Sequence, residues 1–204
     1  MPCQLLARHR VRWVFAAETA EIYPPGHATR VEVAGPAEPF EGRLRPGHFC
    51  GVATVVCRLF QAVPADAAFF GAKDWQQSLV IRRMVTDLGL PIEIVVCPTV
   101  REPDGLALSS RNAYLTPQQR KQARSLSAAL RQARNDWLQA VPVAEITAGM
   151  AAVLTAAGVA VDYADVVDAE SLQPLTAADT AAIALIAGRL GETRLLDNEL
   201  LLPR

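Results

Sequence analysis

Two short stretches of the sequence carry residue types that suit phosphate chemistry. Ser109, Ser110 and Arg111 are consecutive, and they combine two short hydroxyl donors with the rigid donor fork of a guanidinium. The second stretch, Gly71–Asp74, contains Lys73, whose ammonium is a compact and mobile positive charge. Both stretches are therefore predicted to contact phosphate oxygens. An ordinary polar loop without a ligand is the alternative interpretation of the serine–arginine stretch.

Lysine is rare in this chain, which draws attention to Lys73. All of the 20 basic residues are arginine except Lys73 and Lys121. Where arginine is so strongly preferred, a lysine can mark a position that needs a compact ammonium. Lys121 falls on the polar side of a predicted helix and is treated as incidental, whereas Lys73 falls in a predicted turn.

That turn lies between a predicted strand and a predicted helix. Ala67–Phe70 is an apolar run typical of a buried strand, Trp75–Leu88 has helical periodicity ending at Gly89, and Ile92–Cys97 is rich in β-formers. Strand, helix and strand within about thirty residues predict a βαβ unit with parallel strands. Ligands of such sheets bind beyond the carboxyl ends of the strands, near helix N-termini. Lys73 occupies that position.

The serine–arginine stretch is predicted to emerge at the same edge of the sheet. The run Ile92–Cys97 leads at its carboxyl end directly into Pro98–Arg111, where Asp104-Gly105 predicts a turn. Thr116 then begins a helix as N-cap, with proline at the first helical position and Gln119 closing a capping box. The loop is thus held between a turn and a helix, and the two phosphate signals support each other.

The remaining segments complete the predicted organisation. A helix with one buried apolar face follows Arg45-Pro46-Gly47-His48. Further strands and helices are expected from alternation, helical spacing and punctuation by glycine and proline. The strands are Val11–Phe15, Thr29–Val33, Val161–Val167, Ala181–Ala187 and Thr193–Leu196, and the later helices are Thr116–Leu138 and Val143–Ala157.

Composition narrows the function classes. The 204 residues carry a formal net charge of −1, which gives no electrostatic case for nucleic acid or an anionic membrane as partner. No apolar run is long enough to span a membrane, and the N-terminus lacks the apolar core of a signal peptide. The four cysteines, Cys3, Cys50, Cys57 and Cys97, form neither a C-x-x-C pair nor a zinc pattern. Reduced thiols in a cytoplasm and no metal-ligating residues are therefore expected.

Six motifs occur in a fixed order along the chain. They are YPPG at Tyr23–Gly26, RPGHF at Arg45–Phe49, FFGAKDWQQ at Phe69–Gln77, DGLALSSRN at Asp104–Asn112, DYADVVDAESL at Asp162–Leu172 and TRLLDN at Thr193–Asn198. Each motif alone is weak, but the ordered set, from about residue 5 to the end, resembles the pantothenate synthetase (pantoate–β-alanine ligase) family.

The resemblance implies a fold, a reaction and partners. The expected fold is α/β, a Rossmann-like, adenylyltransferase-type parallel sheet followed by a small α+β C-terminal domain, divided as residues 1–103 and 104–204. The expected reaction uses ATP with Mg²⁺: pantoate becomes pantoyl adenylate, and the amine of β-alanine then displaces AMP. A homodimer through the Rossmann-like domain is also implied.

The resemblance also implies roles for individual residues. The expected ATP contacts are Gly71, Ala72, Lys73, Asp74, Val100, Leu108, Ser109, Ser110 and Arg111, and Gln77 is the expected pantoate contact. Lys73, Ser109 and Arg111 are the expected catalytic residues, because they would hold phosphate charge as it shifts in the transition state. Arg45 and His48 are expected near the same cleft, although a structural role, with His48 capping the following helix, is an equal alternative.

Some features depart from the family pattern. Ala72 stands where the family usually has Glu, and Cys50 where it often has Arg, so two charges beside the phosphate region are missing. The H-x-G-H motif of the family's leading segment is also absent from the sequence, and the chain begins where the family's third strand is expected. We therefore expect an N-terminally truncated sheet. By family, the expected function is the ATP-dependent joining of pantoate and β-alanine by a shortened ligase. The alternatives are an inactive remnant that binds nucleotide weakly or only dimerises, and a different adenylate-forming ligase of this fold. For residues 1–204 alone, the remnant is the expectation, so no pantothenate synthesis is expected from them.

Overall fold

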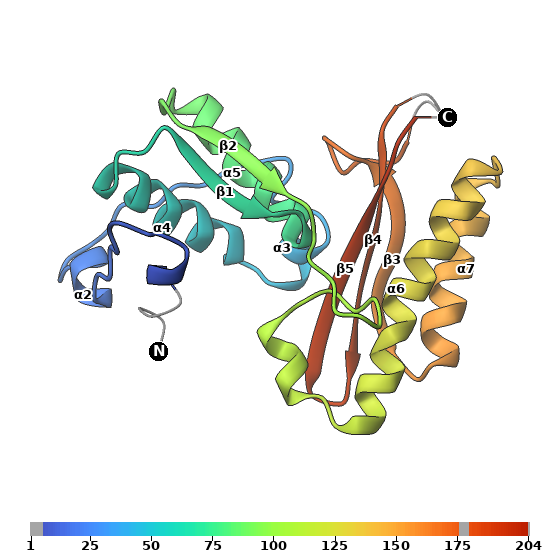
Figure 1. The fold of residues 1–204 in the computed structure, drawn as a ribbon. Helices are drawn as coiled ribbons and strands as arrows, with labels where there is room; N and C mark the ends of the chain where they lie inside the picture. The colour runs from blue at the N-terminus through green and yellow to red at the C-terminus, as the bar shows by residue number, and fades with distance from the viewer. Residues whose placement is uncertain (1–5, 176–179, 204) are drawn as a thin grey trace.

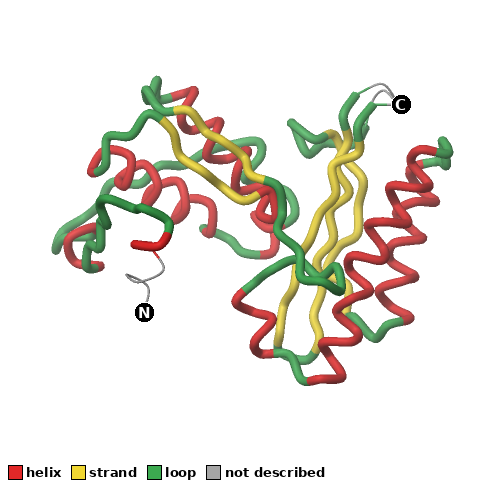
Figure 2. Tube along the Cα trace, viewed as in Figure 1, coloured by secondary structure: helices red, strands yellow, loops and turns green. Residues whose placement is uncertain are grey.

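The computed structural model describes residues 6–175 and 180–203, so Cys3 lies outside the described residues. The described residues form two sheets, each with its own helices (Figure 1). One is a two-stranded parallel sheet and the other a three-stranded antiparallel sheet, and they stand side by side as separate groups of strands (Figure 2). Among the described residues, Cys50, Cys57 and Cys97 are free cysteines.

The N-terminal half is built around the predicted βαβ unit. Strand β1 (Ala67–Gly71) leads through the short 3₁₀ turn η1 (Ala72–Asp74) into helix α5 (Trp75–Asp87), and β2 (Glu93–Cys97) follows. Strands β1 and β2 pair in parallel, with Gly71 opposite Cys97, which confirms the unit. Helix α4 (His48–Ala62) packs against α5, and the short helices α2 (Thr19–Ile22) and α3 (Glu41–Leu44) precede it.

The C-terminal half is an antiparallel sheet covered by two helices. Strands β3 (Ala160–Asp168), β4 (Ala182–Leu190) and β5 (Thr193–Leu201) pair in the order β3-β4-β5. Helices α6 (Pro117–Leu138) and α7 (Val143–Ala156) pack against one face of this sheet (Figure 1). Helix α6 begins as predicted: the Thr116 hydroxyl accepts a hydrogen bond from the backbone of Gln119, whose side chain accepts one from the backbone of Thr116.

The other face of the antiparallel sheet packs against the N-terminal half. Leu79 of α5 and Phe40 are buried against Tyr163 of β3 and against Ile183 and Leu185 of β4. The Trp75 indole also donates a hydrogen bond of 2.8 Å to the backbone oxygen of Ala169. This shared core fixes the start of α5 against the sheet, which is the position that the functional side chains need.

Three sequence predictions about strands are wrong. Val11–Phe15 and Thr29–Val33 form no strand, and Phe69, within β1, is 68% exposed rather than buried. A strand requires a neighbouring edge to complete its hydrogen bonds, and β-propensity reports only how well side chains suit a half-buried pleated surface. Among the described residues, β1 pairs with β2 alone. Val11–Phe15 and Thr29–Val33 therefore have no strand to pair with, and the side chain of Phe69 stays exposed to solvent.

The helices of the described residues were compared with the length and apolar composition of a membrane span. Within residues 6–175 and 180–203, no helix combines the length and the apolar composition that crossing a membrane requires. The predicted division of the chain between residues 103 and 104 stays a prediction.

Candidate active site

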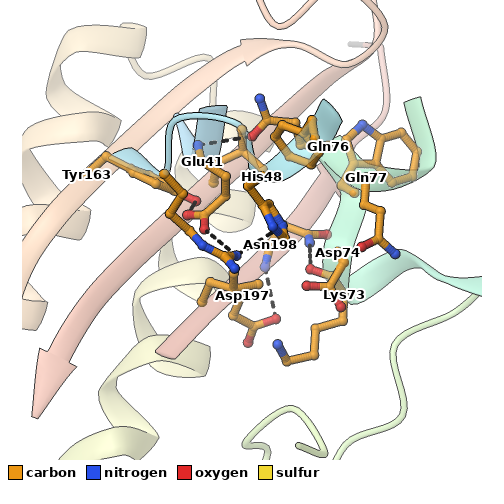
Figure 3. A pocket seen from close by; sticks show the side chains of 14 residues that line it. Glu41, His48, Lys73, Asp74, Gln76, Gln77, Tyr163, Asp197 and Asn198 are labelled. Carbon is orange, nitrogen blue, oxygen red and sulfur yellow. Dashed lines mark hydrogen bonds and ion pairs between the residues drawn. The ribbon is translucent and has the colours of Figure 1, made fainter. Parts of the chain in front are cut away.

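Two adjoining cavities open where the carboxyl end of β1 meets β5. Both cavities are open to solvent, and their empty volumes, solvent space at the mouths included, are about 430 Å³ and about 1070 Å³. They share five lining residues: Arg45, His48, Asp74, Gln77 and Leu196. Together they form one cleft, and the side chains of its first part surround a common space (Figure 3).

Lys73 reaches the cleft from the turn between β1 and α5. It lines the first cavity together with Asp74 and Gln77. The turn is held from the opposite side by Asn198 of β5, whose side-chain amide donates hydrogen bonds to the backbone oxygens of Ala72 (2.9 Å) and Lys73 (2.8 Å). The backbone that carries Lys73 is therefore fixed by β1 of the parallel sheet, which it follows, and by Asn198 of the antiparallel sheet.

The loop that carries Ser109 and Arg111 is fixed by its own contacts. The backbone amide of Leu108 donates to the oxygen of Val100 (2.8 Å), next to a β-bridge between Arg101 and Ala107. The amide of Asn112 donates to Glu102 (2.7 Å) and to the backbone oxygen of Ala107 (3.0 Å). Arg111, at the end of this loop, lines the second cavity.

The predicted site residues divide into two groups. Lys73, Asp74, Gln77 and Arg111 line the cleft. The others stand on the same two segments without lining these two cavities: Gly71, Ala72, Val100, Leu108, Ser109 and Ser110. Val100 and Leu108 are exposed, and the Ser109 hydroxyl accepts a hydrogen bond from the backbone amide of Arg111 (3.3 Å). The fold thus brings the two predicted segments to one edge, and the role of each residue stays a prediction.

A buried ionic cluster beside the cleft was missed by the sequence analysis. The carboxylate of Glu41 accepts two hydrogen bonds from the guanidinium of Arg194, both of 2.7 Å, and one from the Tyr163 hydroxyl (2.9 Å). Arg194 also donates to Asp162 through Nε (2.5 Å). These contacts tie α3 to strands β3 and β5. Glu41 and Tyr163 line the first cavity, while Asp162 and Arg194 line the second.

The cluster shifts the titration of its members. Burial opposes the charge of Glu41, but hydrogen bonds and charge from Arg194, the Tyr163 hydroxyl and Arg45 outweigh it and lower the pKa of the carboxyl. Burial and the charge of Glu41 raise the pKa of Tyr163. The Arg194 guanidinium also has a raised pKa, because hydrogen bonds and charge from Glu41 and Asp162 outweigh its desolvation. All three groups therefore keep their usual charge states at neutral pH.

The capping role considered for His48 is wrong. Gly47, with a φ of 79°, is the N-cap of α4, and no side chain caps that helix end. His48 instead faces the cleft, where its Nε2 lies 3.0 Å from Nη1 of Arg45. Burial and the positive charge of Arg45 lower the pKa of His48, so its imidazole is neutral at neutral pH.

The second half of the chain contributes more to the cleft than its composition indicated. Strand β5 brings Arg194, Leu196 and Asn198 to it, and these residues alternate along the strand, so they share one face. The polar run Asp197-Asn198-Glu199 within a largely apolar strand is the signal that could have identified Asn198. No such pattern marked Glu41, because its burial depends on a partner 153 residues away.

The basic side chains that line the cleft slightly outnumber the acidic ones, which are Glu41, Asp74, Asp162 and Asp197. Arg45, Arg111, Arg189 and Arg194 line the second cavity, and Lys73 lines the first. Guanidinium and ammonium groups suit phosphate and carboxylate oxygens. Among the described residues no group of three or more histidine, cysteine, aspartate or glutamate side chains could hold a metal ion. The geometry therefore favours an anionic ligand bound by arginine and lysine.

Comparison with known proteins gives one consistent family. The family model described as pantoate-beta-alanine ligase matches residues 2–200. A pantothenate synthetase of Acidiphilium cryptum (strain JF-5) is 52% identical over 196 residues, which cover 96% of this chain and 70% of the relative. One of Roseiflexus sp. (strain RS-1) is 50% identical, with 95% of this chain and 70% of the relative covered.

Solved structures agree with this result. A pantothenate synthetase from Thermus thermophilus superimposes with a TM-score of 0.92 at 48% identity, covering 99% of this chain and 74% of that chain. A pantoate-beta-alanine ligase from Francisella tularensis, complexed with beta-gamma ATP and beta-alanine, gives a TM-score of 0.76 at 33% identity and covers 97% and 68% of the two chains. The predicted α/β fold of adenylyltransferase type is thereby confirmed, and the chain belongs to the pantoate-beta-alanine ligase family.

Proposed function

We propose that the cleft binds ATP and pantoate and joins pantoate to β-alanine through a pantoyl adenylate. One observation carries the proposal: Lys73 and Gln77, at the turn and helix start after β1, and Arg111, from a separate loop, line adjoining cavities at the carboxyl end of β1. That edge is where Rossmann-like sheets bind nucleotides. The Francisella relative, whose structure holds beta-gamma ATP and beta-alanine, supports the same assignment.

The proposed chemistry has two steps. An oxygen of the pantoate carboxylate attacks the α-phosphorus of ATP, the bond to the bridging oxygen breaks, and diphosphate leaves. The amine of β-alanine then attacks the acyl carbon, the bond between that carbon and the AMP oxygen breaks, and the amine loses a proton. The products are pantothenate, AMP and diphosphate.

The cationic and amide side chains of the cleft suit the negative charge that develops on the phosphates and the polar groups of pantoate. Lys73 and Arg111 would balance negative charge as it moves to the leaving diphosphate, which stabilises the transition state more than the ground state. The Ser109 hydroxyl, on the loop of Arg111, can add a short hydrogen bond to a phosphate oxygen. Gln77 offers both donors and an acceptor to the hydroxyl and carboxylate of pantoate.

Mg²⁺ is compatible with this site through the nucleotide. In sites of this kind Mg²⁺ keeps several waters and is held by phosphates with one or two carboxylates, where it neutralises charge on the phosphates. Asp74 lines both cavities, and among the described residues it forms no ion pair, so it is the carboxylate that could take this position. A dedicated group of ligands is not required.

An assay of AMP release tests the proposal. Purified residues 1–204 receive ATP, Mg²⁺ and pantoate, and AMP is measured with and without β-alanine. A second reaction also contains the family's leading H-x-G-H segment as a separate polypeptide, because the chain spans only 70% of the Acidiphilium relative. We expect AMP release that requires pantoate and β-alanine in at least one reaction. AMP release without pantoate, or none in either reaction, would refute the proposal.

Three further expectations belong to the same proposal. A homodimer is implied by the family resemblance, and sedimentation velocity would measure it. The division into residues 1–103 and 104–204 predicts two protease-resistant fragments under limited proteolysis. A cytoplasmic location also stays a prediction, which fractionation of the host cell would test.

A further inference from the structure

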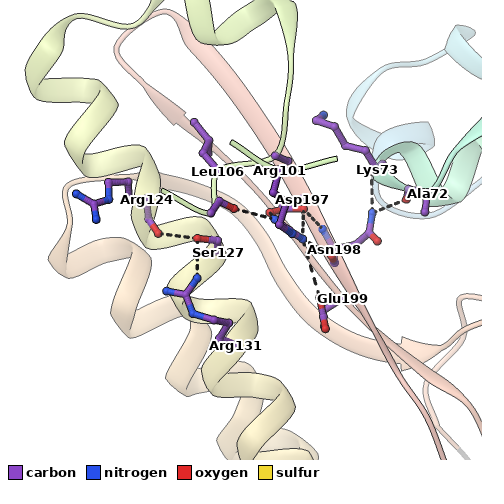
Figure 4. Close-up of polar contacts among 12 residues, drawn as sticks. Ala72, Lys73, Arg101, Leu106, Arg124, Ser127, Arg131, Asp197, Asn198 and Glu199 are labelled. Carbon is purple, nitrogen blue, oxygen red and sulfur yellow. Dashed lines mark hydrogen bonds and ion pairs between the residues drawn. The ribbon is translucent and has the colours of Figure 1, made fainter. Parts of the chain in front are cut away.

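The side chain of Asn198, on the other sheet, holds the turn that carries Lys73. Asn198 is 7% exposed, and its amide nitrogen donates to the backbone oxygens of both Ala72 and Lys73 (Figure 4). One planar group that contacts two consecutive carbonyls fixes the orientation of the turn as well as its position. Strand β5 is also the strand of the antiparallel sheet against which this turn mainly packs.

The neighbour of Asn198 fixes the second phosphate segment in the same way. Asp197, whose side chain is fully buried, accepts two hydrogen bonds from Arg101 (2.6 and 3.1 Å). Arg101 also donates to the backbone oxygens of Gly105 (3.2 Å) and Asn198 (3.3 Å). It thereby joins the beginning of the loop that ends at Arg111 to the same point of β5 (Figure 4).

We propose that Asp197 and Asn198 form a bracket that sets the spacing between the Lys73 turn and the Ser109–Arg111 loop, and that Asn198 is a positioning residue for Lys73. The two segments belong to different parts of the chain and meet through these adjacent residues of one strand. A ligand held from both sides requires that spacing to be fixed before it binds, because small misplacements of catalytic groups cost about 10²-fold in rate. The kinetic part of this inference rests on the proposed function.

Asparagine suits this position for a chemical reason. Its amide supplies two N–H donors, whereas an aspartate of the same shape supplies none and would place negative charge against two carbonyl oxygens. Asn198→Asp should therefore release the turn with little change in packing volume, and Asn198→Ala removes the contact without adding charge. Gln122→Ala is a matched control, because the Gln122 amide also donates to a backbone oxygen, that of Ala157 (2.8 Å), away from the cleft.

The scarcity of lysine makes a direct structural test possible. Labelling with [¹⁵N]lysine gives two backbone amide signals, from Lys73 and Lys121, and Lys121→Arg assigns them. We expect both Asn198 variants to shift the Lys73 signal and to leave that of Lys121 in place, while Gln122→Ala leaves the Lys73 signal in place. A Lys73 signal that stays at the wild-type position in both Asn198 variants would overturn the proposal.

A double-mutant cycle separates positioning from general support of the fold. In the AMP-release assay, Asn198→Ala should lower the adenylation rate by about 10²-fold in the wild-type background. In a Lys73→Ala background the same change should cost less than about 3-fold, because its effect acts through the missing ammonium. Equal losses in both backgrounds would show that Asn198 supports the fold without positioning Lys73, which overturns the proposal.

The NMR measurement and the double-mutant cycle together distinguish a failure of the proposed bracket from a failure of the proposed function. If adding ATP leaves the Lys73 signal unmoved and no substrate-dependent AMP appears, the proposed function fails, and the signal shift in the Asn198 variants alone decides whether the bracket exists. Circular dichroism of each variant verifies that it folds. If Asn198→Ala does not fold, Asn198→Asp carries both arms.

Discussion

Replacing Arg194 by leucine tests the buried cluster of Glu41, Tyr163 and Arg194. The change removes the guanidinium that donates two hydrogen bonds to Glu41, while leucine keeps the stem packed. The side chains of Glu41 and Arg194 are only 8% and 17% exposed, so water cannot readily replace the lost partner. The carboxylate of Glu41 would be left buried with the Tyr163 hydroxyl and the more distant Arg45.

The size of the effect follows from this geometry. Removing one partner of a buried ion pair costs about 3–5 kcal/mol of folding free energy, because the remaining charge is left without compensation. The Tyr163 hydrogen bond and Arg45, at 3.7 Å from Glu41, stay in place, so we expect the lower end, about 3 kcal/mol. Arg189→Leu is the matched control: Arg189 is 52% exposed and lies 3.9 Å from Asp162, and its loss should cost less than about 1 kcal/mol.

The pH dependence has a definite sign. In the wild type the pKa of Glu41 is lowered from its ordinary value of 4.5, so its stabilising contribution is present above that pH and is lost as the pH falls through the lowered value. Without Arg194, burial raises the pKa of Glu41, and the carboxyl takes up a proton at a higher pH. The destabilisation caused by Arg194→Leu should therefore be largest near pH 8 and should shrink as the medium becomes acidic.

Urea denaturation measures both quantities. Unfolding is followed by far-ultraviolet circular dichroism and by tryptophan fluorescence at pH 8 and pH 5, and coincident curves verify a single transition. A loss below about 1 kcal/mol at pH 8, the value expected of an exposed pair, would refute the reasoning. An equal loss at the two pH values would also contradict it, because the penalty would then not come from the charge of Glu41.

Three other substitutions have definite expected results. Lys73→Ala should lower the adenylation rate by about 10²–10³-fold, with partial recovery in Lys73→Arg, and wild-type turnover would remove Lys73 from the site. Gln77→Leu should raise the KM for pantoate far more than that for ATP, since it leaves a substrate polar group unpaired; a selective effect on ATP would show that Gln77 is misassigned. Thr116→Ala should cost about 1 kcal/mol of stability by removing the N-cap of α6, and an unchanged midpoint of urea unfolding would contradict the capping role.

The sequence predicted the elements that depend on local patterns. The βαβ unit, the Thr116 capping box and the placement of Lys73 and Arg111 at one edge follow from spacing and punctuation, and the structure has all of them. The strand predicted at Val11–Phe15 failed because pairing depends on a neighbouring edge, which a local pattern does not report.

The cluster around Glu41 could not be predicted from the sequence, because its contacts join residues far apart in the chain. Its members come from α3, β3 and β5, and Glu41 is separated from Tyr163 by 122 residues. A glutamate beside a glycine in the sequence is indistinguishable from a solvated surface residue. The carboxylate is paired by Arg194 and Tyr163, which the antiparallel sheet brings to it when that sheet packs against Phe40 and Leu79.

The most direct test of the proposed reaction follows one oxygen atom. Pantoate labelled with ¹⁸O in both carboxylate oxygens is turned over with ATP and β-alanine, and the products are examined by mass spectrometry. If the carboxylate attacks the α-phosphorus, AMP gains one ¹⁸O for each pantothenate formed, and the new amide keeps the other. Label found in inorganic phosphate with formation of ADP, or AMP without label, would contradict the account.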